Sequence, residues 1–98
     1  MRSLGYGQAA LQDLKDILDY LDDRSRAAAD RVYDEIMQCI EMLRVVPGMG
    51  HQRPDIRNLN YWCRRVGSYV VVYRYDEETL SVVRVLHGSR DFSSLFGD

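Results

Sequence analysis

The sequence predicts an α+β fold: a short N-terminal strand, then a two-helix antiparallel hairpin packed on a three- to four-stranded, mainly antiparallel sheet. Three observations support this prediction. Leucines recur every three or four residues early in the chain, a second helical pattern follows directly, and the second half has three β-rich runs separated by short turns. With 98 residues the chain has the length of one domain, which we expect to cover residues 1–98.

The helical half of the chain begins after a weak strand candidate at residues 1–6. The first helix is expected over residues 8–23, and its aspartates, Asp13 among them, are expected largely on the solvent side. Ser25 is the predicted N-cap of a second helix that ends near Arg44, before Pro47 and Gly48. The apolar stripe of the first helix contains Leu11, Leu14, Ile17, Leu18 and Leu21, and that of the second contains Ala28 or Ala29, Val32, Ile36, Cys39, Ile40 and Leu43.

Three strands are expected at residues 61–66, 69–75 and 80–86, joined by turns at 67–68 and 76–79. Simple alternation places Val83 and Val85 on one face of the last strand, and Val82, Arg84 and Leu86 on the other. A charged residue in an apolar strand is costly unless it is paired or solvated. We therefore expect the face that carries arginine to be at least partly open, with Arg84 either in an ion pair that holds the C-terminal segment or in contact with a partner.

The composition argues against several classes of protein. No run approaches the roughly 20 apolar residues of a membrane span, and the N-terminus lacks a signal-peptide core, so we expect a cytoplasmic protein with no membrane partner. Cys39 and Cys63 are too few for a disulfide framework and lack metal-ligand spacing. We interpret them as reduced structural thiols and expect neither a metal nor a cofactor.

The charges are unevenly distributed, although the net charge is only −2. Residues 1–43 carry nine acids against five bases, whereas residues 44–98 carry eight arginines against six acids. An arginine-only basic half suits a recognition surface, because guanidinium groups form forked contacts, although genomic base composition could also favour arginine. Without a lysine-rich patch, no direct sequence-specific binding of nucleic acid is expected.

Several short motifs occur in a fixed order along the chain. They are Asp13-Leu14 with Tyr20, Pro47-x-x-Gly50-x-x-Arg53, Ser68-Tyr69 leading into Val72-Tyr73-Arg74, and Arg84-Val85-Leu86-His87-Gly88 followed by Arg90-Asp91. In this order and spacing the chain resembles the ParE-like toxins of the RelE/ParE superfamily of type II toxin–antitoxin systems. The first strand departs from the family pattern because Gly5 and Gly7 interrupt it.

The resemblance implies a toxin of the plasmid-stabilisation type that inhibits DNA gyrase by binding, without catalysis, and that a ParD-like antitoxin neutralises. RelE-like members of the superfamily instead cut mRNA on the ribosome, with polar side chains across the open sheet face. A ribosome-dependent endoribonuclease is therefore the alternative, and an orphan interaction module is a third possibility. Fold alone does not decide among them.

RNA cleavage would require a general base, a cationic clamp and a general acid that converge. His87 could transfer a proton, and the clamp could come from Arg53, Arg65, Arg84 or Arg90. A base is harder to find: Asp55 and Asp91 are more simply interpreted as arginine partners. We expect no catalytic residue, and we interpret His87 as a strand-end residue whose ring nitrogens bond the backbone or Asp91.

Antitoxins of this family have a C-terminal segment that wraps the helical hairpin and the sheet edge. For this chain we expect an apolar groove on the hairpin and arginines facing an acidic tail. Aromatic residues near arginines, such as Trp62, suit the same interface. The predicted target- or antitoxin-binding residues are Leu18, Leu21, Tyr33, Met37, Arg53, Trp62, Arg65, Arg74, Arg84 and Arg90.

Overall fold

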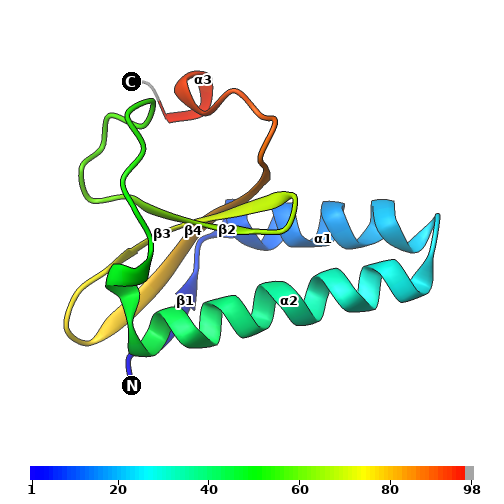
Figure 1. Ribbon diagram of the computed structural model, residues 1–98, viewed down its shortest axis with the longest axis horizontal. Helices are drawn as coiled ribbons and strands as arrows, with labels where there is room; N and C mark the ends of the chain where they lie inside the picture. The colour runs from blue at the N-terminus through cyan, green and yellow to red at the C-terminus, as the bar shows by residue number, and fades with distance from the viewer. Residues whose placement is uncertain (97–98) are drawn as a thin grey trace.

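The computed structural model describes residues 1–96 and contains the predicted elements in the predicted order (Figure 1). Strands and helices begin and end within one or two residues of their expected bounds. A short C-terminal helix and a single 3-10 turn were not predicted. The elements are β1 (Ser3–Tyr6), α1 (Gln8–Asp22), α2 (Arg26–Val45), the 3-10 turn η1 (Pro47–Met49), β2 (Trp62–Val66), β3 (Tyr69–Tyr75), β4 (Thr79–His87) and α3 (Phe92–Phe96).

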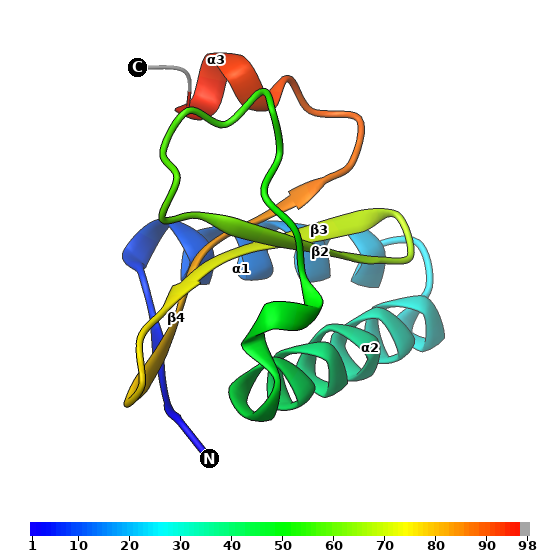
Figure 2. The same cartoon turned by 60° about the vertical axis from the view of Figure 1, so that its left-hand side comes forward.

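The four strands form one mixed sheet in the order β1-β4-β3-β2. β2, β3 and β4 form an antiparallel meander, while β1 pairs in parallel with the first half of β4, from Ser3 opposite Thr79 to Tyr6 opposite Val82. The first strand therefore forms despite its glycines. It places the N-terminus beside the turn between β3 and β4 (Figure 2).

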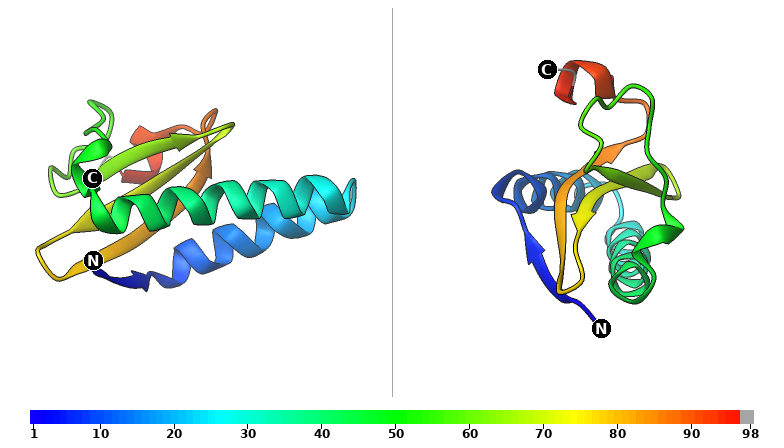
Figure 3. Two further views of the ribbon diagram at one scale, coloured as in Figure 1. Left: turned by 60° about the horizontal axis from the view of Figure 1, so that its bottom comes forward. Right: turned by 90° about the vertical axis from the view of Figure 1, so that its left-hand side faces the viewer.

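The helical hairpin covers one face of the sheet (Figure 3). The Ser25 hydroxyl accepts a hydrogen bond from the Ala28 amide at 3.2 Å, which confirms the predicted N-cap. Ile36 of α2 and Val85 of β4 are both buried in the core between the helices and the sheet, as their spacing predicts. This main core consists of Ala10, Leu14, Ile36, Cys39, Ile40, Leu43, Val71, Tyr73, Leu80, Val82 and Val85.

A β-bulge in β4 makes the predicted alternation of that strand wrong. Val72 pairs with Arg84, whereas the next residue of β3, Tyr73, pairs with Val82, so β4 has one extra residue at this point. Beyond the bulge the faces exchange. Val82 and Val85 both belong to the main core, while Leu86 packs on the opposite face.

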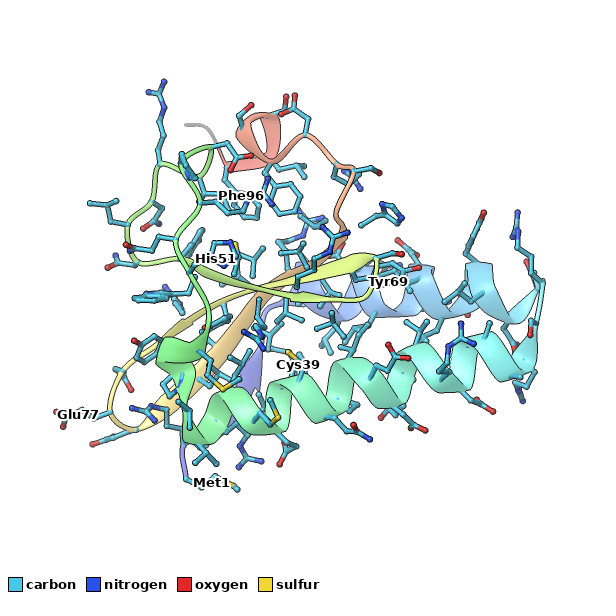
Figure 4. All side chains as sticks on the ribbon, viewed as in Figure 1. Met1, Cys39, His51, Tyr69, Glu77 and Phe96 are labelled. Carbon is cyan, nitrogen blue, oxygen red and sulfur yellow. The ribbon has the colours of Figure 1, made fainter. Side chains whose placement is uncertain are left out.

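The opposite face of the sheet is covered too, which corrects the expectation that it is partly open. The loop between η1 and β2 and the short helix α3 lie over it (Figures 1 and 2), and they bury a second apolar core. In Figure 4, Phe96 lies on this side of the sheet and Cys39 on the helical side. The second core consists of Ile56, Cys63, Val70, Val72, Leu86 and Phe92.

Both cysteines are buried free thiols, as interpreted from the sequence. Burial raises the pKa of the Cys63 thiol to about 11, so it stays protonated at neutral pH. Within residues 1–96, no helix combines the length and apolarity needed to cross a lipid bilayer.

The loop that leaves α2 is fixed by one buried tyrosine. The Tyr73 hydroxyl donates a hydrogen bond to the Pro47 carbonyl oxygen, and Gly50 packs directly against the same hydroxyl. A Cβ atom at position 50 would collide with the Tyr73 hydroxyl and with the Cys63 carbonyl oxygen. The Pro47-x-x-Gly50 spacing therefore allows the backbone to lie close to the Tyr73 hydroxyl. The same contacts direct the following loop across the second face of the sheet.

Candidate functional site

Arg84 is held in a two-pronged ion pair with Asp13 of α1. Its Nε and Nη2 atoms lie 2.7 and 2.9 Å from the two Asp13 carboxylate oxygens, and Asp13 Oδ2 also accepts the Val85 amide at 2.9 Å. The hydrogen bond that Arg84 donates to Asp13 raises the pKa of Arg84 above its ordinary value. The ion-pair interpretation of Arg84 is confirmed, but its partner is α1, and Asp13 does not lie on the solvent side.

The Arg53 side chain is also bound by other residues of the fold. Its guanidinium donates to both Asp55 carboxylate oxygens at 2.8 and 2.9 Å and lies 4.0 Å from the centre of the Phe92 ring. The hydrogen bond from Arg53 holds the pKa of Asp55 below its ordinary value. Asp55 is thus an arginine partner, as predicted. The pair helps to fasten α3 to the loop that covers the second face.

Asp91 is not an arginine partner, contrary to the prediction. Its carboxylate accepts hydrogen bonds from the Ser93 hydroxyl at 2.7 Å and the Ser94 hydroxyl at 2.6 Å, at the start of α3. These bonds, led by the one from Ser94, lower the pKa of Asp91 to about 2. The residue stabilises the beginning of the helix.

His87 is an exposed residue at the end of β4. Its Nδ1 atom accepts the Ser89 amide at 3.1 Å and lies 2.7 Å from the Ser89 hydroxyl, and its ring meets the edge of Tyr69 at 5.5 Å. Bonding to the backbone is therefore confirmed, but the partner is Ser89 and not Asp91. Because Nδ1 accepts a backbone amide, the neutral ring carries its proton on Nε2.

Besides Arg53, four residues were candidates for an endoribonuclease site, and they lie in different surroundings. His87 pairs across the sheet with Tyr69, on the face that Val71 shares, whereas Arg65 lies two residues from Cys63 and so shares the second face. Arg84 is bound to α1, and Arg90 is exposed beyond the turn that ends β4. Within residues 1–96, no three potential metal ligands gather either.

A shallow groove of about 300 Å³ runs between α1 and α2, where an interaction groove was predicted. Leu18 and Tyr33 line it as expected. Leu21 is half-buried but is not part of the lining, and Met37 packs instead against the main core, where its sulfur accepts the Tyr6 hydroxyl at 3.7 Å. The lining residues are Leu18, Asp19, Asp22, Arg26, Ala29, Asp30 and Tyr33.

Trp62 and Arg74 line a second, polar concavity of about 660 Å³ at the end where β3 and β4 extend beyond β2. Asn60 and the β4 hydroxyls that complete this concavity were not identified from the sequence. They come from a loop and from the far side of a hairpin, and no motif joins them. The lining consists of Asn60, Trp62, Arg74, Tyr75, Asp76, Thr79 and Ser81.

Comparison with known proteins identifies the family. The model of the family described as "ParE toxin of type II toxin-antitoxin system, parDE" matches residues 5–92. No curated protein sequence matches the chain significantly.

Solved structures show the same fold at low sequence identity. A chromosomal ParDE toxin–antitoxin system from P. aeruginosa is 20% identical, with 89% of this chain and 96% of that chain covered and a TM-score of 0.72. A YoeB/ParE toxin from Agrobacterium tumefaciens is 19% identical, with 87% and 96% covered and a TM-score of 0.57. YafQ from E. coli strain BL21(DE3) is 15% identical, with 99% and 100% covered and a TM-score of 0.54.

The family match spans nearly every element described above, from within β1 to the first residue of α3. It includes Asp13 and Arg84, which join the helices to the sheet, and the loop that Tyr73 fixes. The chain belongs to the ParE toxin family of type II toxin–antitoxin systems.

Proposed function

We propose that this toxin acts in the cytoplasm by binding and inhibiting DNA gyrase, that it catalyses no reaction, and that a ParD-like antitoxin neutralises it. The observation that carries the proposal is the covered second face of the sheet. Ile56 and Phe92 pack over Val70, Val72 and Leu86 there, so the surface on which RelE-like relatives arrange polar catalytic groups is an apolar core in this chain.

The polar residues that remain also favour binding over catalysis. Cleavage of RNA needs a base, an acid and a phosphate clamp within reach of one scissile bond. Arg84 and Arg53 are each neutralised by an aspartate, and Asp91 is engaged at the start of α3. His87 forms its hydrogen bonds with Ser89 and not with Arg84, Arg53 or Asp91. It could therefore act on a substrate only without those three residues.

The antitoxin contact is proposed for the groove between α1 and α2 together with the arginines at the sheet. Leu18 and Tyr33 offer apolar area in the groove, and Arg65 and Arg74 are exposed cations for an acidic tail. A segment that is disordered when free can span two such separate sites.

The decisive experiment compares the two activities with purified protein. The toxin should inhibit supercoiling by gyrase or trap cleaved DNA, and it should leave ribosome-bound mRNA intact. His87→Ala should retain whatever inhibition the wild type shows, since no chemical step depends on it. Codon-specific cuts mapped in mRNA, lost in His87→Ala, would establish the endoribonuclease instead.

Two further observations bear on the proposal in cells. Expression of the toxin without antitoxin should make cells filament. A ribbon-helix-helix gene immediately upstream of the toxin gene would argue against an orphan module.

A further inference from the structure

Several backbone groups along the outer edges of the sheet are bound by other parts of the chain. On β2, the amide and carbonyl of Cys63 exchange hydrogen bonds with His51 at 2.7 and 2.9 Å. On β4, Asp13 accepts the amide that lies beyond the end of β1. At the start of β1, the Arg2 amide donates to the Arg44 carbonyl oxygen at 3.3 Å, and Arg44 Nε donates to the Arg2 carbonyl oxygen at 2.8 Å. Contacts of this kind keep a strand edge from pairing with another chain.

The middle of β1 has no such contact. The amides of Ser3 and Gly7 each donate to β4 at 2.9 Å, so alternation along the strand turns Gly5 toward β4 as well. The backbone groups of Leu4 and Tyr6 therefore point away from the sheet, and within residues 1–96 they have no hydrogen-bond partner. In the right-hand view of Figure 3, β1 lies at the margin of the sheet, with no helix or strand outside it.

This open edge is symmetrical about Gly5. If two copies of β1 run antiparallel with their Gly5 residues opposite each other, Leu4 of each copy lies opposite Tyr6 of the other. Both pairs are then of the hydrogen-bonded type, so four N–H···O bonds form. The two Gly5 residues form the closer, non-hydrogen-bonded pair, where the lack of a side chain leaves room for close approach. Any other centre would set an open residue opposite Arg2, whose backbone is already bound, or opposite the first residue of α1.

Apolar side chains are exposed where the ends of this pairing would meet. The pairing brings the start of α1 of one copy, where Leu11 is 52% exposed, to the N-terminal end of β1 of the other. That end lies beside the C-terminal end of α2, where Figure 4 also places Met1. Met42, Val45 and Val46 are exposed there, at a spacing that puts them on one side of the helix end. Groups of exposed apolar side chains mark interaction surfaces.

We propose that the outer edge of β1, formed by residues 3–7, binds a second copy of this chain by antiparallel pairing of the two β1 strands about a twofold axis at Gly5. A twofold interface uses the same surface on both subunits, and this edge is complementary to itself. Two four-stranded sheets then join into one continuous sheet. Because the paired segment is short, the dimer should be weak and its formation should depend on the toxin concentration.

Gly5→Cys tests the pairing by cross-linking the full-length toxin. In the single copy, the nearest atom to a Cβ at position 5 is Ser81 Oγ at 4.0 Å, so the new side chain fits. In the dimer the two cysteines form a non-hydrogen-bonded pair, whose Cα atoms, about 4.5 Å apart, are within disulfide range. Mild oxidation should therefore give a covalent dimer on non-reducing electrophoresis. The wild type should give none, because Cys39 and Cys63 are buried.

Ser3→Cys is the matched control for the cross-link. Ser3 is exposed and lies on the same face of β1 as Gly5. In the proposed register, however, the two Ser3 residues are four positions apart along the paired strands, or about 13 Å, which no disulfide spans. Ser3→Cys should cross-link far more slowly than Gly5→Cys. Equal rates would mean that the molecules meet at random, and they overturn the proposal.

Sedimentation velocity over a range of toxin concentrations measures the association without a cross-link. Gly5→Asp sets two carboxylates opposite each other across the axis, so it should weaken the dimer about fivefold, and added salt should restore part of the loss. Gly5→Asn has the same size without the charge and should associate more nearly like the wild type. Urea unfolding should show that both variants are folded.

Three results would overturn the proposal. The wild type could stay monomeric up to about 1 mM, the range of the weakest specific complexes. Gly5→Asp could associate as well as Gly5→Asn. Gly5→Asp could also weaken the antitoxin complex and leave self-association unchanged, in which case the edge serves the antitoxin. A toxin that forms the Gly5→Cys dimer but fails to inhibit gyrase would leave this proposal standing and remove the gyrase proposal.

Discussion

At the residue scale, the carboxylate of Asp13 joins α1 to β4 through two neighbouring residues of the strand, Arg84 and Val85. β1 pairs with β4 only as far as Val82, so the outward amide of Val85 has no strand partner. The Asp13 carboxylate accepts hydrogen bonds from that amide and from the Nε and Nη2 atoms of Arg84. It thereby protects an exposed strand edge and fastens α1 to β4 with the same two oxygens.

Asp13→Asn should destabilise the protein by about 1–3 kcal/mol, because it leaves a half-buried arginine without its counter-charge. Urea unfolding measures the effect. Asp19→Asn is the matched control on α1: its pair with Lys15 is exposed, so its loss should cost less than about 0.5 kcal/mol. Equal effects of the two substitutions would show that the Arg84 pair contributes no more than a surface pair.

The carboxyl of Asp91 should titrate well below its ordinary range. Its pKa of about 2 in the folded protein lies under the unfolded value of about 3.9, so its contribution to stability is present above pH ~4 and is lost as the pH falls toward 2. Carboxyl NMR titration measures this directly. The double variant Ser93→Ala/Ser94→Ala should move the pKa of Asp91 back toward its ordinary value. An unchanged pKa would mean that the hydroxyls are not its cause.

At the element scale, the sequence predicts the regular helices well but does not predict the irregularity of β4. Both helices were predicted within one residue, because apolar spacing and Ser25 are local signals. The bulge in β4 arises from pairing with β3 and leaves no trace in an unbroken apolar run. With only five residues, α3 is too short to show a period.

The same contrast applies to the candidate site. Leu18 and Tyr33 were located in the groove because helical spacing gives the side of a helix on which a residue lies. Arg84 and Asp13, which are 71 residues apart, could not be joined, because nothing in the sequence reports which polar residues two elements bring together. Met37 was misplaced for a similar reason: its contact with Tyr6 depends on where β1 lies.

Ile36→Ala tests the packing of α2 on the sheet. The side chain is fully buried in the main core, so its truncation should cost about 2–5 kcal/mol of unfolding free energy, a large share of the ~5–15 kcal/mol typical of a domain. Met42→Ala on the same helix is the control, since Met42 is 50% exposed and should cost little. A loss below about 1 kcal/mol at position 36 would contradict the assigned face of the helix.

At the scale of the whole molecule, the effect of a substitution on binding can be separated from its effect on stability by choosing residues outside both apolar cores. Met37→Glu, the obvious change from the sequence, would also disturb folding, because Met37 packs against the main core. Tyr33 is 46% exposed and lines the groove, so it is the better position.

Tyr33→Glu should weaken the complex with the antitoxin at least tenfold, because it places an unpaired charge against an apolar partner and beside Asp30. Calorimetric titration with the antitoxin measures the affinity. Tyr20→Glu is the control: this residue is 55% exposed on α1 and lies outside the groove lining. Unchanged affinity in Tyr33→Glu would place the antitoxin on another face.

The parallel pairing of β1 with β4 has a consequence for the time at which a newly made molecule can complete its fold. Ser3 and Thr79 are 76 residues apart, so a ribosome finishes the first strand long before it makes the partner of that strand. Non-local pairing of this kind delays folding, and a chain that emerges N-terminus first cannot close the sheet or form the Asp13–Arg84 pair until its last strand is free. Each copy therefore lacks its closed sheet for most of its translation, and on the proposed function it cannot act during that time. An antitoxin already present in the cell has that interval to be in place before the toxin folds.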